Sequence, residues 1–373
     1  MQKKIIALAV AGLVSGAAFA QSNVTVFGIV DMGYQYSWDN STSNAKNMSQ
    51  IKAGGLDGSR FGFRGSEDLG NGLKANFEMA AGFDADTGKS YGGVLMSEGA
   101  FVGLSNASWG EVKAGYFGSF LDDNTGIDAS GRHGMINTGS LYGTGKYPNF
   151  VAYYSPVFSG LQVKAGFSSN AMYNPTTNAV GQDVAPVQNA TYDNVRAYTA
   201  AVSYTNGPLK AGIAYAAYRP QAVNLSVGSQ TTSSSSDWNA GVSYDFGVAT
   251  VSLFGAQQKI NDLNVNFITN PGITTGYDKK TFWALGANAP IGANDLVKVG
   301  YGQSKLTGPN NIVNGKGKAW DVVYLHSMSK RTTVYAMYGS VDSNDANGTT
   351  NILGLGTDGT YRQALNVGLR HTF

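Results

Sequence analysis

Residues 361–373 alternate between apolar and polar side chains, and this pattern restricts the possible folds more than any other feature of the sequence. One face carries the apolar residues Tyr361, Leu365, Val367, Leu369 and Phe373. The other face carries Arg362, Asn366, Arg370 and Thr372. Successive side chains of a β-strand project to opposite sides, so this segment is predicted to be a strand that separates water from an apolar phase.

The same period of two recurs at residues 73–79, 161–168 and 209–215, whereas amphipathic helical periodicity is hard to find. Beyond the first twenty residues, no apolar run approaches the ~18 residues of a helical membrane span. The sequence therefore predicts an all-β antiparallel barrel in a membrane. A soluble, glycine-rich β-solenoid is the alternative that the 50 glycines leave open.

Residues 1–20 have the organisation of a secretory signal peptide. Lys3 and Lys4 form a basic start, Ile5–Val14 an apolar stretch, and Ala18–Ala20 a small-residue cleavage site. We expect cleavage after Ala20, one β-barrel domain over 21–373, and a location in the outer membrane of a Gram-negative bacterium.

Composition excludes several classes of protein. The expected signal holds two of the 26 basic residues and no acidic one, which leaves 24 basic residues against 24 acidic ones. A chain without excess positive charge is a poor candidate for binding nucleic acid. The absence of cysteine excludes disulfides, thiolate catalysis and cysteine–zinc sites. Charged residues make up 13%, against roughly 25% in soluble domains.

Short and long connections alternate along the chain. Seven are short and rich in turn residues, namely 67–72, 105–110, 155–160, 206–208, 245–247, 290–295 and 327–330. Eight are long and polar, near 39–55, 84–97, 118–148, 170–193, 220–236, 261–277, 307–316 and 343–360. This alternation predicts about 16 strands, with both ends of the chain on one side of the membrane.

The segment 118–148 is long, rich in glycine and carries charges of both signs. Loops longer than about 12–15 residues are usually functional or disordered. A barrel of about 16 strands is too wide to be filled by its own wall. We therefore expect this loop to fold into the lumen and narrow it, with an exposed loop as the alternative.

Several stretches resemble the Gram-negative general diffusion porins of β-proteobacteria. The opening strand reads VTVFGIVD at 24–31, and the most diagnostic block reads SRFGFRGSEDLGNGLKA at 59–75. Further matches are AFVGL at 100–104, the turn at 154–160 and the terminal VGLRHTF at 367–373. The resemblance extends through the mature chain.

This resemblance implies a homotrimer of 16-stranded barrels, each with a water-filled pore that an inward third loop constricts. It also implies a transverse electric field, with arginines on the wall facing acidic residues on the loop. Periodicity independently turns Arg60 and Arg64 inward, because they lie on the face opposite Phe61 and Phe63. The candidate constriction residues are Arg60, Arg64, Lys74, Glu78, Glu98, Asp122, Asp123, Asp128, Arg132 and Lys146.

Two positions depart from the arginines that the family usually carries, Glu98 and Tyr116. Glu98 has the strand parity of Val102, on the face opposite Phe101, and is expected in the lumen, paired with Arg60 or Arg64. These departures leave the choice between anions and cations open, and weak selectivity of either sign fits the sequence.

The expected permeants are small hydrophilic solutes and ions. The resemblance also implies contact with outer-membrane lipids and lipopolysaccharide. Phe373 and Leu369 match the signal that the barrel-assembly machinery reads. We expect no cofactor, no metal and no catalysis.

Alternatives remain. An outer-membrane enzyme would require a Ser-His or Asp-His constellation, for which three histidines give little material. Asp122, Asp123 and Asp128 could hold calcium, although their spacing does not match an EF-hand. A substrate-selective porin would present an aromatic row, of which Tyr116, Tyr142 and Tyr147 are a hint. Long polar loops would also suit an adhesin.

Overall fold

The computed structural model describes residues 23–40, 46–125, 127, 145–171, 194–221, 235–259, 279–308, 313–345 and 361–373. The first part of the sheet contains β1 (Asn23–Asn40), β2 (Met48–Ala53), β3 (Arg60–Gly70), β4 (Leu73–Asp84), β5 (Lys89–Ser90), β6 (Gly99–Asn106), β7 (Gly110–Gly118), β8 (Lys146–Tyr154) and β9 (Leu161–Ser168). The second part contains β10 (Asn194–Asn206), β11 (Leu209–Gln221), β12 (Ser235–Asp245), β13 (Thr250–Lys259), β14 (Lys279–Pro290), β15 (Asp295–Thr307), β16 (Val313–Ser327), β17 (Thr332–Asp345) and β18 (Tyr361–Thr372). Two short helices accompany them, η1 (Tyr91–Gly93) and α2 (Phe120–Thr125).

The strands form one antiparallel sheet that closes on itself, because β1 pairs with β18 on one side and with β2 and β3 on the other. β2 and β3 share one position in the wall, and β5 pairs only with the end of β4. Counted with β2 and β3 as one strand of the wall and without β5, the barrel has 16 wall strands, here called staves. This confirms the expected fold class. No helix among the described residues is long and apolar enough to cross a membrane.

The closing seam joins the two ends of the chain. Ile29 lies opposite Thr372 and Asp31 opposite Arg370. Gly28 and Phe373 exchange two backbone hydrogen bonds of 3.1 Å, and the Phe373 ring lies where a Cβ on Gly28 would collide with it. The terminal strand is thus a stave of the barrel, as its alternation predicts.

The two faces of the wall differ in polarity. Outward positions carry exposed apolar side chains, such as Leu365, Val367 and Leu369 on β18. Inward positions of other strands are polar and buried, such as Gln35 on β1 and Asn239 on β12. This division follows from the period of two, because one face of each strand meets lipid and the other meets the lumen.

The short connections all lie at the end of the barrel where β1 begins and β18 ends, and the strand ends that the long connections join lie at the opposite end. The sequence prediction is wrong at one of them, since residues 48–53 of the expected loop 39–55 form β2. This polar segment is a strand because β1 is 18 residues long and offers its upper half as a pairing edge.

The second stave is interrupted between β2 and β3. Met32 pairs with Ala53 and Ile29 with Arg60, so residues 54–59 lie opposite only two residues of β1. The extra residues of this segment leave the hydrogen-bonded ladder at Gly54, whose φ of 71° suits glycine. A Cβ at the next glycine, Gly55, would collide with the Tyr335 hydroxyl.

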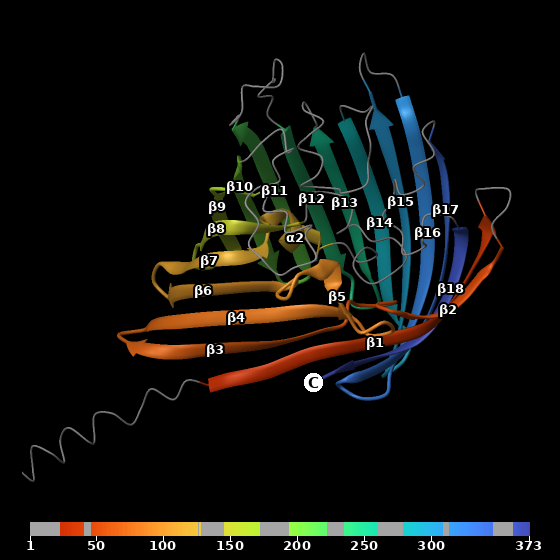
Figure 1. Cartoon of the computed structure of the whole chain (residues 1–373), viewed down its shortest axis with the longest axis horizontal. Coiled ribbons are helices and arrows are strands. Elements are labelled where there is room, and N and C mark those ends of the chain that lie inside the picture. The colour runs from red at the N-terminus through yellow and green to blue at the C-terminus, as the bar shows by residue number, and fades with distance from the viewer. Residues whose placement is uncertain are drawn as a thin grey trace, which may run out of the picture.

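α2 lies inside the barrel, in front of β11 and β12 (Figure 1). Its Phe120 and Leu121 are fully buried. Asn239 on β12 donates a 2.8 Å hydrogen bond to the Leu121 carbonyl and accepts one of 3.1 Å from Asn124. The described start of the long third loop is therefore folded into the lumen, as expected.

Candidate functional site

The inward segment 54–59 is held by a single buried carboxylate. Asp31 on β1 is 0% exposed, and its Oδ2 accepts the backbone N–H groups of Leu56 at 3.1 Å and Asp57 at 2.7 Å. Its Oδ1 accepts the hydroxyl of Tyr335 on β17 at 2.6 Å. The Ser59 hydroxyl accepts the Asp31 backbone N–H at 3.0 Å. Asp31 thus fixes this segment against the wall.

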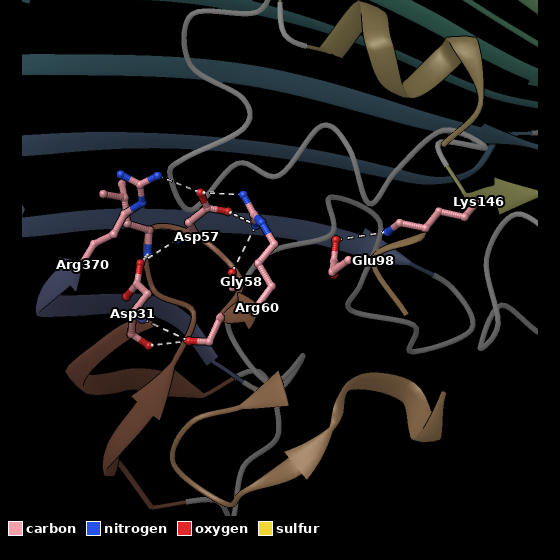
Figure 2. Close-up of polar contacts among 9 residues, drawn as sticks. Asp31, Asp57, Gly58, Arg60, Glu98, Lys146 and Arg370 are labelled. Carbon is pink, nitrogen blue, oxygen red and sulfur yellow. Dashed lines mark hydrogen bonds and ion pairs between the residues drawn. The ribbon is translucent and has the colours of Figure 1, made fainter. Parts of the chain in front are cut away.

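This segment carries a carboxylate into contact with two arginines. Asp57 accepts hydrogen bonds from both terminal nitrogens of Arg60, at 2.9 and 3.4 Å, and from Arg370 on β18 at 3.3 Å. All three side chains are partly exposed, at 13%, 29% and 26%. Figure 2 shows Asp57 between the two guanidinium groups, and we call these residues the Asp57 cluster.

A second ion pair lies apart from this cluster (Figure 2). Glu98 accepts a 3.3 Å bond from Lys146, at the start of β8. The carboxylate lies on the inward face, because a Cβ on Gly82 would be 3.0 Å from its Oε1 and Gly82 pairs with Arg60. Glu98 is therefore in the lumen as expected, but its ion-pair partner is Lys146 rather than Arg60 or Arg64.

The strand parity that we assumed for Glu98 is wrong. Val102 is 61% exposed on the outward face, whereas Phe101 points inward and packs on Phe117. Glu98 precedes β6, and Gly99 at the strand's start has a φ of 133°, so the period of two does not extend to it. Glu98 reaches the lumen through this turn.

A third cluster surrounds the inward helix. Asp123 on α2 forms a 2.8 Å ion pair with Lys164 on β9. Lys164 and Lys113 on β7 both lie over the ring of Tyr154, at 5.5 and 4.9 Å from its centre. Lys113 also forms a 3.3 Å ion pair with Glu111. The loop carboxylate Asp123 is thus paired with one lysine of the wall, not with an arginine as the resemblance implied.

Arg64 and Lys74 lie closer to the short-turn end. Arg64 pairs in register with Glu78, and its guanidinium lies 5.1 Å from the centre of the Phe27 ring. Lys74 pairs with Asp68 beside the β3–β4 turn. It is eight residues from Gly82, or roughly 27 Å along the strand. Lys74 therefore does not belong with the other candidates, because inward parity alone does not set height in the barrel.

The structure describes only some of the remaining candidate residues. Asp122 lies on α2, with its carboxylate near Gly118, whereas Asp128 and Arg132 lie outside the described residues. Among the described residues there is no group of three or more potential metal ligands. The calcium hypothesis includes Asp128 and stays a prediction. Tyr147 is 1% exposed and shares a 2.6 Å hydrogen bond with Tyr218, so it does not form an aromatic row along an open pore.

Sequence reasoning missed several lumen residues. Arg370 was placed on the water-facing side of the last strand, but its partner was not foreseen. Lys164 and Lys113 have inward parity in amphipathic strands, which could have identified them. Asp31 and Asp57 had a weaker signal, the Gly54-Gly55 pair that interrupts the strand pattern.

Comparison with known proteins agrees with this architecture. The family model for Gram-negative porins matches residues 7–346. The chain is 31% identical to an outer membrane porin of Bordetella pertussis and 30% identical to outer membrane porin protein 32 of Delftia acidovorans, each over all of both chains. An anion-selective porin from Comamonas acidovorans superposes with a TM-score of 0.71 at 26% identity, covering 95% of this chain and 100% of its own.

The fold is shared more widely. OmpT, an outer membrane protein of Vibrio cholerae solved in its trimer form, matches 94% of this chain with a TM-score of 0.64 at 16% identity. The structure is a closed barrel with an inward helix in its third loop and charged residues on its inner wall. The full-length relatives are outer-membrane porins, so both observations lead to the same assignment. The chain belongs to the Gram-negative porin family and is an outer-membrane channel protein.

Proposed function

We propose that this porin passes small hydrophilic solutes and ions passively, without catalysis, through a constriction of mixed charge with a weak preference for anions. Three groups supply the charge: the Asp57 cluster, the pair Glu98–Lys146, and Asp123 with Lys164. The Asp57 cluster carries the proposal, because two arginines share one carboxylate there. The pair Glu98–Lys146 is balanced, and so is the contact between Asp123 and Lys164.

The surplus positive charge of the Asp57 cluster would attract anions, and its carboxylate would keep that attraction weak. Fixed charges at a narrow, wet aperture act most strongly when ionic strength is low. The similar porin from Comamonas acidovorans is named as anion-selective, which supports a preference for anions in this chain. Glu98 reduces this preference for anions. Its carboxylate stands where the family usually carries an arginine, and it neutralises Lys146.

We infer a homotrimer, a signal peptide over residues 1–20, and contact with lipopolysaccharide. The trimer is supported by the OmpT structure and by the unequal heights of the wall. The staves β6–β9 have 8 or 9 residues, whereas β10–β17 have 10 to 15 (Figure 1). A low wall suits burial at the centre of a trimer, and a tall wall suits contact with lipid.

Planar-bilayer recording tests this function. Purified protein should insert as channels that stay open, conduct in proportion to voltage and close in three steps. A gradient of potassium chloride should give a small reversal potential of the sign that favours chloride. Refolded, heat-modifiable protein that does not conduct would overturn the proposal, and single-step closure would overturn the trimer.

A further inference from the structure

Two glycines lie opposite each other on the inner wall of the barrel, beneath the helix α2 of the third loop. Gly212 on β11 pairs in register with Gly241 on β12. Both positions face the lumen, because the residues that follow them, Ile213 and Val242, are exposed on the outward face. The wall therefore has no side chain at two adjacent points. We call these two positions the glycine notch.

The end of the helix and the residues after it fill this notch. A Cβ on Gly212 would collide with Oδ1 of Asn124 and would lie 2.9 Å from Cδ1 of Ile127. A Cβ on Gly241 would lie 3.1 Å from Cγ2 of Ile127. Glycine permits such a close approach because it carries no Cβ. The start of the third loop can thus lie this close to the wall only because both positions are glycine.

An amide clamp holds the helix in the notch. Asn239 on β12, two residues before Gly241, is 0% exposed. Its amide nitrogen donates a 2.8 Å hydrogen bond to the Leu121 carbonyl, and its amide oxygen accepts one of 3.1 Å from Asn124. Asn124 therefore fills the notch and is tied to the wall at the same place. Both bonds join neutral groups, so salt does not screen them as it screens an ion pair.

Other contacts attach α2 to a second sector of the wall. The ring of Phe120 packs edge-on against Tyr154 of β8, with ring centres 5.4 Å apart. Asp123 forms its 2.8 Å ion pair with Lys164 of β9. These contacts come from β8 and β9, whereas the notch and the clamp belong to β11 and β12. The helix is fixed to both sectors, and the notch sets its distance from β11 and β12.

We propose that Gly212, Gly241 and Asn239 are positioning residues for diffusion, which set how far α2 lies from the wall and thereby the width of the pore. The proposal rests on the proposed channel function and adds the residues that control the size of the permeating solute. A side chain in the notch would push the helix toward the lumen, because α2 lies on the lumen side of β11 and β12 (Figure 1). The open cross-section would then shrink, and large solutes would be slowed more than small ones.

The test compares three glycine-to-alanine variants of the full barrel, which differ in the space around the new methyl group. In Gly212→Ala it collides with the residues that fill the notch, and in Gly241→Ala it lies 3.1 Å from them. Gly255→Ala, on the outward face of β13, is the matched control, since its methyl group lies 3.8 Å from the Phe282 carbonyl. Single-channel conductance should fall most for Gly212→Ala, less for Gly241→Ala and not at all for Gly255→Ala.

Solute size gives a second measurement. In liposome swelling, Gly212→Ala should slow the entry of a disaccharide by a larger factor than the entry of a monosaccharide. A preparation with fewer active channels would slow both sugars by the same factor. The ratio of the two rates therefore reports the width of the pore and does not depend on the amount of folded protein.

Two further variants separate the position of the helix from its attachment. Asn239→Ala removes both bonds of the clamp and adds no bulk, so it should give noisier current without the loss of conductance. Gly212→Ala/Asn124→Ala removes the side chain that the new methyl group meets and should recover conductance relative to Gly212→Ala alone. Such recovery is expected only where the two residues act through one contact. Quiet current in Asn239→Ala would refute the clamp.

Heat-modifiability shows which variants are folded. Folded Gly212→Ala that conducts as the wild type does, or that slows both sugars by the same factor, would overturn the proposal. An equal loss of conductance in Gly255→Ala would also overturn it. If Gly212→Ala does not fold, Gly241→Ala takes its place, and unchanged conductance and sugar ratio there would refute the notch. A folded wild-type barrel that does not conduct would instead refute the proposed channel function.

Discussion

Arg370, on the last strand of the chain, donates a 3.3 Å hydrogen bond to Asp57, on the segment that interrupts the first hairpin. The contact crosses the seam that closes the barrel, because β18 pairs with β1 at this height. Closure of the barrel therefore completes the Asp57 cluster. A feature of the constriction is formed only when the first and last staves meet.

Asp31→Ala should loosen the segment 54–59. The methyl side chain has no oxygen to accept the N–H groups of Leu56 and Asp57, and both donors lose this partner. Such a loss costs about 1–3 kcal/mol. We expect a lower melting temperature and noisier single-channel current. Tyr335→Phe removes only one bond from the same carboxylate and should have the smaller effect in both measurements. Equal effects would contradict the role of Asp31.

Glu98→Gln and Lys146→Gln should shift the reversal potential in opposite directions, the first toward anions and the second toward cations. The double variant should return close to wild type, because the two charges neutralise each other at 3.3 Å. A double variant that keeps the shift of either single variant, or single variants that shift the potential in the same direction, would contradict a balanced pair of Glu98 and Lys146 in the open channel.

Deletion of Phe373 should reduce the amount of folded protein in the outer membrane. The residue closes the seam through two backbone bonds to Gly28 and covers that glycine with its ring. Membrane fractionation with heat-modifiability measures the effect. Phe246→Ala, at an exposed aromatic in the β12–β13 turn, is the control and should assemble normally. Normal membrane levels of the deletion variant would contradict the assembly role of Phe373.

The regular part of this fold could be predicted from the sequence. Each strand meets water on one side and lipid on the other, so alternation alone places Arg60 and Arg64 in the lumen and Leu365 at the lipid. The number of strands then follows from the turn residues, because each short connection needs glycine, proline, asparagine or aspartate.

Irregular positions could not be predicted in the same way. Parity fails at Gly99, where the strand starts with a left-handed backbone, and so the face assigned to Val102 was wrong. Asp57 lies where residues leave the ladder, and its arginine partners come from different staves. Ion pairs such as Asp123–Lys164 join a loop to a distant strand, and no local pattern encodes that contact.

The most direct test of the mixed-charge constriction is the reversal potential of Asp57→Asn in a gradient of potassium chloride. Loss of the carboxylate leaves the charges of Arg60 and Arg370 without their shared partner. The anion-to-cation permeability ratio should rise roughly two- to fivefold, since a unit charge at ~4 Å in water is worth about 1 kcal/mol. The rise should be greater at 0.1 M than at 1 M salt. Asp342→Asn, on the outer surface, should leave the ratio unchanged. A ratio for Asp57→Asn equal to wild type at both salt concentrations would contradict the account.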